Sequence, residues 1–306
     1  LILGGVLPTS AQIMGLGLRI DGLSLPFIAL TLGLLPLVLI FSAAEARGQN
    51  GEEKYYALML ILTAALIGIA CTTDLFNLWL WFELMVTSTY FLIAFHRDHP
   101  ATFEAVFKYL VQSALGSTLV LFGIALMLAQ SGTLALKQPS GSVSFDVAGV
   151  LLIIGFGVKL AIVPLHTWLP DTYSQASDGI SALLAGVVTV TGMIPLLRVL
   201  TPLPSFAGLL LLFGLVNIIV GNLLALRQRQ LKRLLAFSSL PHIGYMLFGI
   251  GIGLFTGTPD GIRSGLFQML IHGLMKGLAF LAAGVLLNAL HGQSAIARPL
   301  RIDDLN

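Results

Sequence analysis

Charged residues are scarce in this chain of 306 residues. Only 10% of them are charged, whereas 57% are hydrophobic, and soluble domains carry about 25% charged residues. With a mean hydropathy of +0.95, the chain has too few polar side chains to cover an apolar core in water. The composition therefore excludes an ordinary soluble protein and indicates a protein whose solvent is the lipid bilayer.

Other absences exclude whole classes of site. Cys71 is the only cysteine, which excludes an intrachain disulfide and a cysteine-ligated metal or iron–sulfur site. The net charge of +2 lacks the strong basic excess that nucleic-acid binding requires. The sequence has no glycine-rich phosphate loop after a strand, no nucleophile elbow and no haem-type histidine pair. We therefore expect no cofactor, no metal and no nucleic-acid partner on this chain, and we expect any chemistry to be the movement of protons or ions.

Neither end of the sequence has the character of a terminus. It starts at Leu1 rather than at a methionine, and no basic segment of a signal peptide precedes its first apolar residues. Residues 298–306 have the polar character of a connecting loop. We expect residues 1–306 to form a single membrane domain that is part of a longer protein.

Long apolar runs predict the architecture. A membrane-spanning helix needs about 20 mostly apolar residues, whereas membrane barrels use alternating segments of about ten residues. The runs here are too long and too uniform for a barrel, so we expect an all-α, polytopic membrane protein. Nine segments are long enough to span: 23–43, 55–73, 75–95, 104–130, 147–170, 178–200, 205–226, 231–255 and 261–291.

Basic residues between these segments predict the orientation, because cytoplasmic loops carry an excess of Lys and Arg. One side of the predicted bundle has nine basic residues and the other has four. We expect the richer side, which includes the loop 227–233, to face the cytoplasm and the start of the chain to lie outside a cell's inner membrane. The nine are Arg47, Lys54, Arg97, Arg227, Arg229, Lys232, Arg233, Arg298 and Arg301, and the four are Arg19, Lys137, Arg198 and Arg263.

Proline interrupts two of the predicted spans. Pro164 and Pro170 lie six residues apart in the segment 147–170, and Pro241 lies within 231–255. Proline removes a backbone donor and clashes with the preceding turn. We therefore expect a broken fifth span and a kinked eighth span, with protein or water satisfying the freed backbone groups.

Two ionisable residues lie deep in predicted spans. Glu83 is nine residues into 75–95 and Lys159 is thirteen residues into 147–170. An ionisable group at such a depth costs about 2.5–3.5 kcal/mol on insertion scales, and usually faces a protein interior or a hydrated cavity. Glu83 is either a functional carboxylate or a neutral hydrogen-bonding anchor between helices. Lys159 is either a proton carrier or one half of a permanent ion pair.

Further basic residues extend this set. His272 and Lys276 are four residues apart and share one helix face, which indicates a hydrated path rather than a metal site. Other candidates for a proton relay also have structural interpretations. Lys108 is close enough to a helix end for its ammonium to reach the interface, and His166 and His242 lie beside the predicted breaks. The last candidate, Lys232, is also explained as an interfacial anchor or as a residue that orders a loop.

Four segments of the sequence together resemble one family. Residues 157–171 (GVKLAIVPLHTWLPD) match its signature of lysine, proline and H-x-W-L-P-D, and 79–85 (WLWFELM) match its F-W-E-L-M. Residues 231–244 (LKRLLAFSSLPHIG) resemble its K-R-L-L-A-x-S-S-x-x-H-x-G, and 272–281 (HGLMKGLAFL) resemble its H-x-x-x-K-A-L-L-F-L. This is the family of antiporter-like subunits found in proton-pumping NADH:quinone oxidoreductase (respiratory complex I), Mrp-type Na+/H+ antiporters and membrane-bound hydrogenases.

The resemblance implies a fold and a set of functional residues. The family fold has about fourteen helices in two inverted five-helix repeats, each with a broken helix. This chain would carry the first repeat at 55–200 and part of the second at 201–306. By position, Glu83 and Lys159 match the family's charged pair, His272 and Lys276 match its central relay, and Lys108 matches a less consistent lysine.

The sequence departs from the family pattern at one position. Within residues 185–191 (AGVVTVT), Val190 stands where the family often has a lysine. A hydrophobic side chain cannot hold a proton, so the usual link between the two halves is missing or replaced. Water together with Thr189 or Thr191 would be one replacement.

We therefore expect a proton-translocating subunit of a complex I-type NAD(P)H:quinone oxidoreductase. The resemblance implies other membrane subunits as partners and places flavin, iron–sulfur clusters and quinone on those partners. It implies no redox centre on this chain and transport of protons, with Na+ as an alternative ion. The alternatives are an Mrp-type Na+/H+ antiporter subunit, a hydrogenase antiporter subunit, or a scaffold copy that has lost pumping, for which Val190 is the best support.

Overall fold

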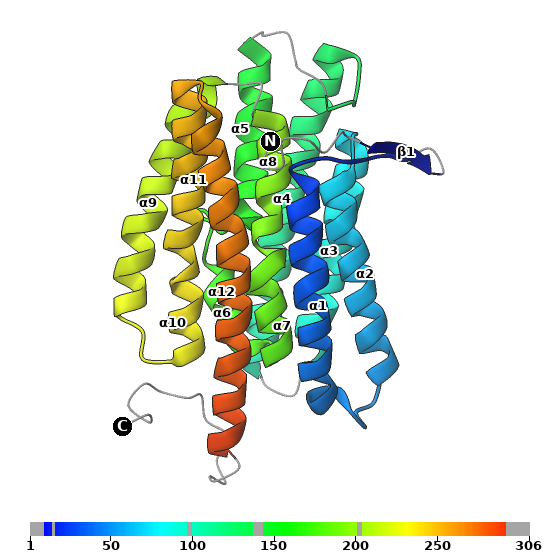
Figure 1. Ribbon diagram of the computed structural model, residues 1–306, viewed down its shortest axis with the longest axis vertical. Coiled ribbons are helices and arrows are strands. Elements are labelled where there is room, and N and C mark those ends of the chain that lie inside the picture. Colours follow the sequence, from blue (N-terminus) through cyan, green and yellow to red (C-terminus); the bar gives the residue numbers. More distant parts are fainter. Residues whose placement is uncertain (1–8, 14–15, 97–99, 137–142, 201–203, 292–306) are drawn as a thin grey trace.

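A computed structural model describes residues 9–13, 16–96, 100–136, 143–200 and 204–291. In these ranges the chain is a bundle of long, nearly parallel helices (Figure 1). The helices are α1 (Ser24–Ala46), α2 (Glu52–Cys71), α3 (Leu75–Ile93), α4 (Pro100–Ser131), α5 (Val143–Lys159), α6 (Trp168–Gln175), α7 (Asp178–Leu183), α8 (Met193–Leu200), α9 (Ala207–Leu226), α10 (Leu231–Phe237), α11 (Ser239–Thr256) and α12 (Pro259–His291).

The helices match the predicted spans closely. In the described part of the chain, eight helical segments are long and apolar enough to cross a membrane. The ninth predicted span, 147–170, is divided between α5 and α6 by a non-helical stretch, as its two prolines predict. The eighth predicted span is interrupted at Ser238, between α10 and α11, three residues before Pro241.

Two other features were not predicted. A short antiparallel hairpin of β1 (Thr9–Ile13) and β2 (Leu16–Ile20) precedes α1, so the chain is mostly rather than entirely helical. The segment 178–200 changes from α7 to a π-helical turn, η2 (Leu184–Val188), and to a 3-10 turn, η3 (Val190–Gly192), before α8. Apolar periodicity does not distinguish these tighter and wider turns from a continuous helix.

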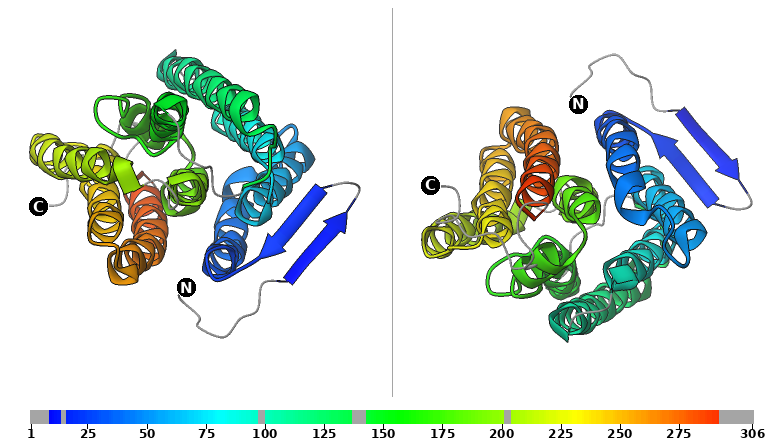
Figure 2. Two further views of the ribbon diagram at one scale, coloured as in Figure 1. Left: turned by 90° about the horizontal axis from the view of Figure 1, so that it is seen from above. Right: turned by 90° about the horizontal axis from the view of Figure 1, so that it is seen from below.

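The helices surround one central segment (Figure 2). The views along the bundle place α1 to α4 on one side and α9 to α12 on the other, with 178–200 between them. All of the apolar window of 178–200 is buried, whereas the other spans keep part of theirs exposed. Val190 therefore lies in the interior of the bundle, where it is 0% exposed.

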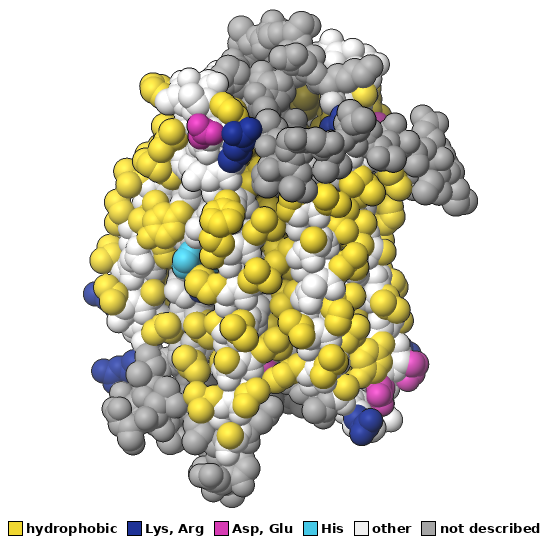
Figure 3. Space-filling view, in the orientation of Figure 1, with side chains coloured by type: hydrophobic (Ala, Val, Ile, Leu, Met, Phe, Trp, Pro, Cys, Tyr) yellow, Lys and Arg dark blue, Asp and Glu magenta, His cyan; other side chains and the backbone are white. Residues whose placement is uncertain are grey.

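The surface fits a bilayer. In Figure 3, apolar side chains cover the middle of the face shown, and Lys, Arg, Asp and Glu gather near its two ends. Large residues such as Ile40, Phe107 and Leu278 are exposed, and an extensive apolar surface of this kind is typical of a protein in contact with a membrane or a partner. The composition, the spans and this surface identify a multi-pass membrane protein.

The basic residues are divided between the two ends of the bundle, as predicted. The α1–α2 and α9–α10 connections lie at the lower end in Figure 1, and the β-hairpin and the α11–α12 connection lie at the upper end. Arg47, Arg227 and Arg229 therefore lie at the end opposite Arg19 and Arg263. Four members of the two sets, Arg97, Lys137, Arg298 and Arg301, fall outside the described residues.

Candidate functional site

Lys159 is the last residue of α5, directly before the break in the fifth span. Its side chain is buried, at 2% exposure. The carbonyl end of a helix favours a cation, so the backbone of α5 itself helps to hold an ammonium at this position. Lys159 is thus buried in the interior at a helix end whose carbonyl groups stabilise its positive charge.

Side chains from other helices satisfy the backbone freed by the break. Asn217 of α9 is fully buried; its Oδ1 accepts from the Val163 N–H at 2.7 Å, and its Nδ2 donates to the Ala161 carbonyl at 3.5 Å. The Trp168 indole donates to the Val158 carbonyl at 2.8 Å. These bonds meet the requirement that non-helical backbone in a membrane be covered by protein.

The nearest polar partner of Lys159 is a hydroxyl group. Its Nζ donates to the Tyr109 hydroxyl at 2.7 Å and lies 4.8 Å from the centre of the Tyr109 ring and 5.4 Å from the Trp168 ring. In the described ranges, the ion pairs do not include Lys159. The predicted pairing with Glu83 is therefore replaced in this conformation by a neutral partner.

Glu83 lies on α3 and accepts a hydrogen bond from Ser117 of α4. Ser117 also accepts from the indole of Trp79 at 2.8 Å. Tyr109, Ser113 and Ser117 are spaced four residues apart, so they share one face of α4, and all three are buried. This row of hydroxyls connects the Lys159 end of the site to the Glu83 end.

His272 and Lys276 lie on the inner face of α12, as their spacing predicts, and are 0% and 3% exposed. Lys276 Nζ donates to the Ser238 hydroxyl at 2.6 Å and to the Leu235 carbonyl at 3.0 Å, at the interruption between α10 and α11. The second buried lysine thus also meets neutral oxygens at the end of a short helix.

His242 joins this second group. Its ring centre lies 5.5 Å from that of His272, and its Nδ1 is 2.9 Å from Gln268 Nε2. Neither ring nitrogen of His272 has a hydrogen-bond partner within the described residues.

Lys108 and Lys232 have carboxylate partners. Lys108 lies 2.7 Å from Asp171 and 2.6 Å from Glu104, and Lys232 lies 2.8 Å from Asp178. These contacts favour the anchoring interpretation of both lysines, and their role in a relay stays a prediction.

Asp171 and His166 complete the lower end of the broken span. Asp171 also binds Arg233 at 2.7 Å, so it ties α10 to α6. His166 lies in the non-helical stretch with its ring centre 6.5 Å from that of Phe237. Its Nδ1 is buried with no hydrogen-bond partner in the described part of the chain, and its predicted relay role is untested.

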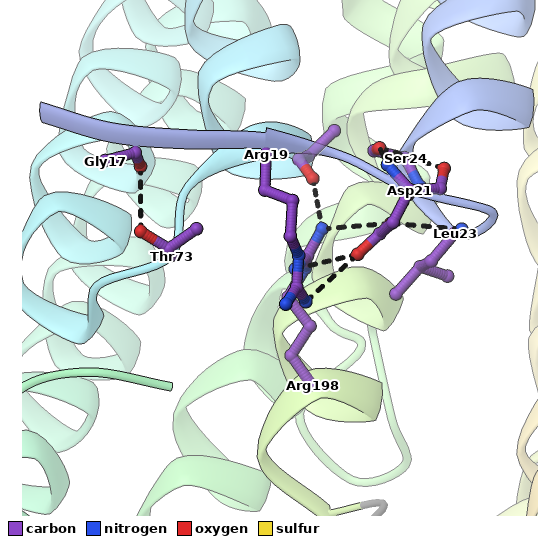
Figure 4. Close-up of polar contacts among 8 residues, drawn as sticks. Gly17, Arg19, Asp21, Leu23, Ser24, Thr73 and Arg198 are labelled. Atoms are coloured by element: carbon purple, nitrogen blue, oxygen red, sulfur yellow. Dashed lines mark hydrogen bonds and ion pairs between the residues drawn. The ribbon is translucent and has the colours of Figure 1, made fainter. Parts of the chain in front are cut away.

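The upper end of the bundle is closed by a second set of charges (Figure 4). Asp21 binds Arg198 of α8 at 3.4 Å and Arg19 at 3.1 Å, and Arg198 also donates to the Ala70 carbonyl at 2.6 Å. Arg198 has a side-chain exposure of 5%. It is therefore a buried residue that links α8 to α2 and to the segment before α1, rather than an anchor at the membrane–water interface. The Thr73 hydroxyl donates to the Gly17 carbonyl at 3.0 Å and attaches β2 beside it.

Burial by itself raises the pKa of the Asp21 carboxyl. The neighbouring Arg198 and Arg19 and the N–H groups of Ser24 and Leu23 lower it more strongly, so its pKa lies below the usual value.

The sequence interpretation missed several residues of the site. Tyr109 and Asn217 are uncharged, so a search for ionisable residues in spans passes over them. One signal was available for Tyr109, because Tyr109, Ser113 and Ser117 repeat at helical spacing in an apolar span. Asp171 is the last residue of the motif at 157–171, but no local pattern indicates its two basic partners, which are 63 and 62 residues away in sequence.

Among the described residues, no three His, Cys, Asp or Glu side chains are grouped as metal ligands. The arrangement instead comprises buried bases, hydroxyls and the carboxylates of Glu83 and Asp171. Such groups exchange protons with one another and with water.

Comparisons with known proteins agree with this geometry. Residues 72–300 match the family described as NADH:quinone oxidoreductase/Mrp antiporter, transmembrane. A relative from Thermosynechococcus vestitus, NAD(P)H-quinone oxidoreductase chain 4 2, is 38% identical over 285 residues, which cover 90% of this chain and 52% of the relative.

Two solved structures have the same fold. A chain of the Mrp complex from Dietzia superposes with a TM-score of 0.81 at 25% identity, covering 92% of this chain and 54% of its own length. A chain of respiratory complex I from Thermus thermophilus with bound aureothin gives a TM-score of 0.74 at 31% identity, covering 87% and 58%.

The chain spans about half the length of the curated relatives it matches. The match to the family nevertheless extends over most of the described bundle, from the end of α2 through α12. It includes the broken span, its buried lysine and the His272–Lys276 pair. The chain therefore belongs to the NADH:quinone oxidoreductase/Mrp antiporter transmembrane family.

Proposed function

We propose that this chain is a proton-translocating, antiporter-like subunit of a complex I-type NAD(P)H:quinone oxidoreductase. The observation that carries the proposal is Lys159, a buried lysine at a helix break whose polar partner is the neutral Tyr109 hydroxyl. Among the described residues, no carboxylate pairs with Lys159 and fixes it in the charged form. The relatives named as NAD(P)H-quinone oxidoreductase chains support the choice of complex.

In the proposed cycle, Glu83 controls the protonation of Lys159. At a separation of about 4 Å and an effective dielectric constant near 20, the carboxylate stabilises the ammonium by about 4 kcal/mol. When Lys159 moves to Tyr109, that stabilisation weakens and desolvation favours release of the proton. The hydroxyls of Tyr109, Ser113 and Ser117 lie along the path between the two positions.

The released proton passes to a second group built from His272 and Lys276, with His242 and His166 as further relay candidates. Lys108 and Lys232, the other two candidates from the sequence, serve as anchors in this scheme because each is held by a carboxylate. The residues 55–200 would form one inverted repeat and 201–306 part of a second. Inverted repeats with broken helices near the midplane are a common transporter design. Lys159 at the α5–α6 break and Lys276 against the α10–α11 interruption support this division.

The rest of the machinery would lie on partner subunits. Redox energy, flavin, iron–sulfur clusters and quinone would belong to those partners. The subunit would lie in the cytoplasmic membrane, with the lower end in Figure 1, including the loop 227–233, in the cytoplasm.

The decisive experiment is proton pumping in membrane vesicles that contain the whole complex, driven by NAD(P)H. Lys159→Ala and Glu83→Ala are each expected to reduce proton uptake by at least about 100-fold, because proton transfer at a positioned group is typically worth about 10² to 10⁴. Lys54→Ala is a matched control, since Lys54 is an exposed lysine at the start of α2. Full pumping by both test variants would exclude the proposal.

The Mrp fold match supports a second candidate, a Na+/H+ antiporter subunit that uses the same residues without electron transfer. The Dietzia chain superposes with the higher TM-score of the two structures described above. Sodium-dependent proton flux in the absence of NAD(P)H would favour this candidate. Redox turnover without any change in flux between the native protein and its Lys159→Ala variant would instead indicate a scaffold.

A further inference from the structure

The centre of the bundle contains a pair of hydrogen-bonded hydroxyls beside Val190. The Tyr173 hydroxyl of α6 lies 2.5 Å from the Thr189 Oγ1 and 3.2 Å from the Leu184 carbonyl oxygen. Tyr173 and Thr189 are both 0% exposed. Buried hydroxyls are normally hydrogen-bonded, and here each of the two hydroxyls has a partner from a different helical segment.

This pair lies between the two groups of ionisable residues. On one side, the Tyr173 ring contacts Trp168 at 6.4 Å, and Trp168 in turn faces the Lys159 ammonium. On the other side, Tyr173 contacts Phe280 of α12 at 5.4 Å, and His272 of the same helix lies against the backbone of Ala185.

The irregular turns of the central segment present Thr189 to Tyr173. In η2, the Thr189 N–H donates to the Leu184 carbonyl, five residues back, rather than four as in an α-helix. The same carbonyl accepts from Tyr173. Thr191, two residues later, bonds its hydroxyl to the Val187 carbonyl of its own helix at 2.8 Å. The two threonines therefore differ: the bond of Thr189 crosses between segments, and that of Thr191 does not.

Close helix packing keeps this segment against α12. A Cβ atom added at Gly186 would lie 3.0 Å from the Gly273 carbonyl, and one added at Gly273 would lie 2.7 Å from the Gly186 carbonyl. The absence of side chains here allows the two backbones to approach. Thr189 lies three residues, about one helical turn, after Gly186, where the central segment contacts the helix that carries His272 and Lys276.

We propose that the Tyr173 and Thr189 hydroxyls form the proton-conducting link between Lys159 and the His272–Lys276 group, in place of an ionisable side chain at position 190. This inference rests on the proposed function. A proton that reaches one hydroxyl oxygen displaces that hydroxyl's own proton to the second oxygen, whose proton passes on through water towards His272. Rotation of the two hydroxyls restores the starting state, so the proton count balances and neither residue is left charged.

The test uses proton uptake by vesicles that contain the whole complex, with Tyr173→Phe and Thr189→Val as the variants. Each removes one hydroxyl and keeps the shape of the side chain. Each is expected to lower uptake at least about tenfold, and the double variant is expected to lose little more than either alone. Thr191→Val is the matched control, and Thr189→Ser, which keeps a hydroxyl, is expected to retain most of the flux.

A rescue separates conduction from packing. Val190→Lys in the Tyr173→Phe background places a proton carrier beside the interrupted link and is expected to restore a large part of the flux, which a purely structural role of Tyr173 would not allow. Full uptake by Tyr173→Phe and Thr189→Val, together with loss of uptake in Lys159→Ala, would overturn the link and leave the proposed function standing. Full uptake in both Lys159→Ala and Glu83→Ala would overturn the link and the proposed function together.

Discussion

The charges at the ends of the bundle and the charges at its centre have different partners. At the ends, Arg198 meets Asp21 and Lys232 meets Asp178, each within 3.4 Å. At the centre, Lys159 donates to a tyrosine hydroxyl and Lys276 to a serine hydroxyl and a backbone carbonyl.

This difference separates anchors from groups that can change their charge. A carboxylate strongly favours the charged form of its basic partner, and removing one member of a buried pair leaves an uncompensated charge. A hydroxyl donates as well as it accepts, so it can remain hydrogen-bonded to either form of a lysine. The chemistry of the partner, more than burial alone, therefore marks Lys159 and Lys276 as candidates for proton transfer.

The largest effect that would test this comparison is a contrast between two lysines. Lys276→Met is expected to reduce proton uptake at least about tenfold with little loss of thermal stability, because it removes a buried charge that pairs with no carboxylate in the described part of the chain. Lys232→Met is expected to lower thermal stability and to retain most of the proton uptake, since it leaves Asp178 without its partner. Flux and thermal unfolding in detergent, measured on both variants, check this; equal loss of flux in the two would remove the distinction.

Arg198→Met is expected to give the largest loss of stability among the end-of-bundle changes. Breaking a buried ion pair costs about 3–5 kcal/mol, and we expect about 3 kcal/mol here because Asp21 is 21% exposed and keeps Arg19. Chemical or thermal unfolding of the purified protein measures the change. Arg263→Met is the control, since Arg263 lies at the same end with a side-chain exposure of 50%. An equal loss of stability in both variants would contradict a specific contribution of the Arg198–Asp21 ion pair.

Asn217→Leu tests the backbone at the break. The change keeps the branched heavy-atom skeleton of the side chain but removes the acceptor of the Val163 N–H, and a buried unsatisfied donor costs about 1–3 kcal/mol. We expect a lower unfolding temperature and reduced proton flux, because the loosened break no longer fixes Lys159. Asn222→Leu on the same helix is exposed and bonds only within α9, so it is expected to be neutral; similar behaviour of the two variants would rule out a specific role.

The smallest expected effect is a pH dependence from Asp21. Its pKa is lower in the folded protein than in the unfolded chain, so the stabilisation is fully present above a pH near 4 and is lost as the pH falls through the folded value. We expect a contribution of about 1 kcal/mol or less, since the carboxylate is partly exposed. Unfolding of the native protein and of Asp21→Asn between pH 5 and 3 measures this contribution. The difference between their free energies of unfolding should shrink as the pH falls, and a constant difference would contradict a contribution from the Asp21 carboxylate.

Prediction from the sequence succeeded where a signal is local. Spans were located within a few residues because about 20 apolar residues in a row have one stable conformation in a bilayer. The break in the fifth span followed from Pro164 and Pro170, and the shared face of His272 and Lys276 followed from their spacing of four.

Prediction was incomplete where a partner comes from a distant part of the chain. The Tyr109 hydroxyl lies 50 residues from Lys159, and Asn217 lies 54 residues from Val163. Nothing near Thr189 in the sequence distinguishes it from Thr191, yet their hydroxyls have different partners. The β-hairpin was also missed, because the predicted elements rest on long apolar runs and each of its two strands has only five residues.

The sequence by itself determined that this is a polytopic membrane protein with a broken fifth span and ionisable residues within it, because hydropathy, proline and charge act over a few residues. Only the tertiary structure decided which of those ionisable residues meet carboxylates and which meet hydroxyls. It also placed a tyrosine–threonine pair beside Val190. The physical reason is that a proton path depends on which atoms of different helices come within hydrogen-bonding distance, and that is fixed by packing.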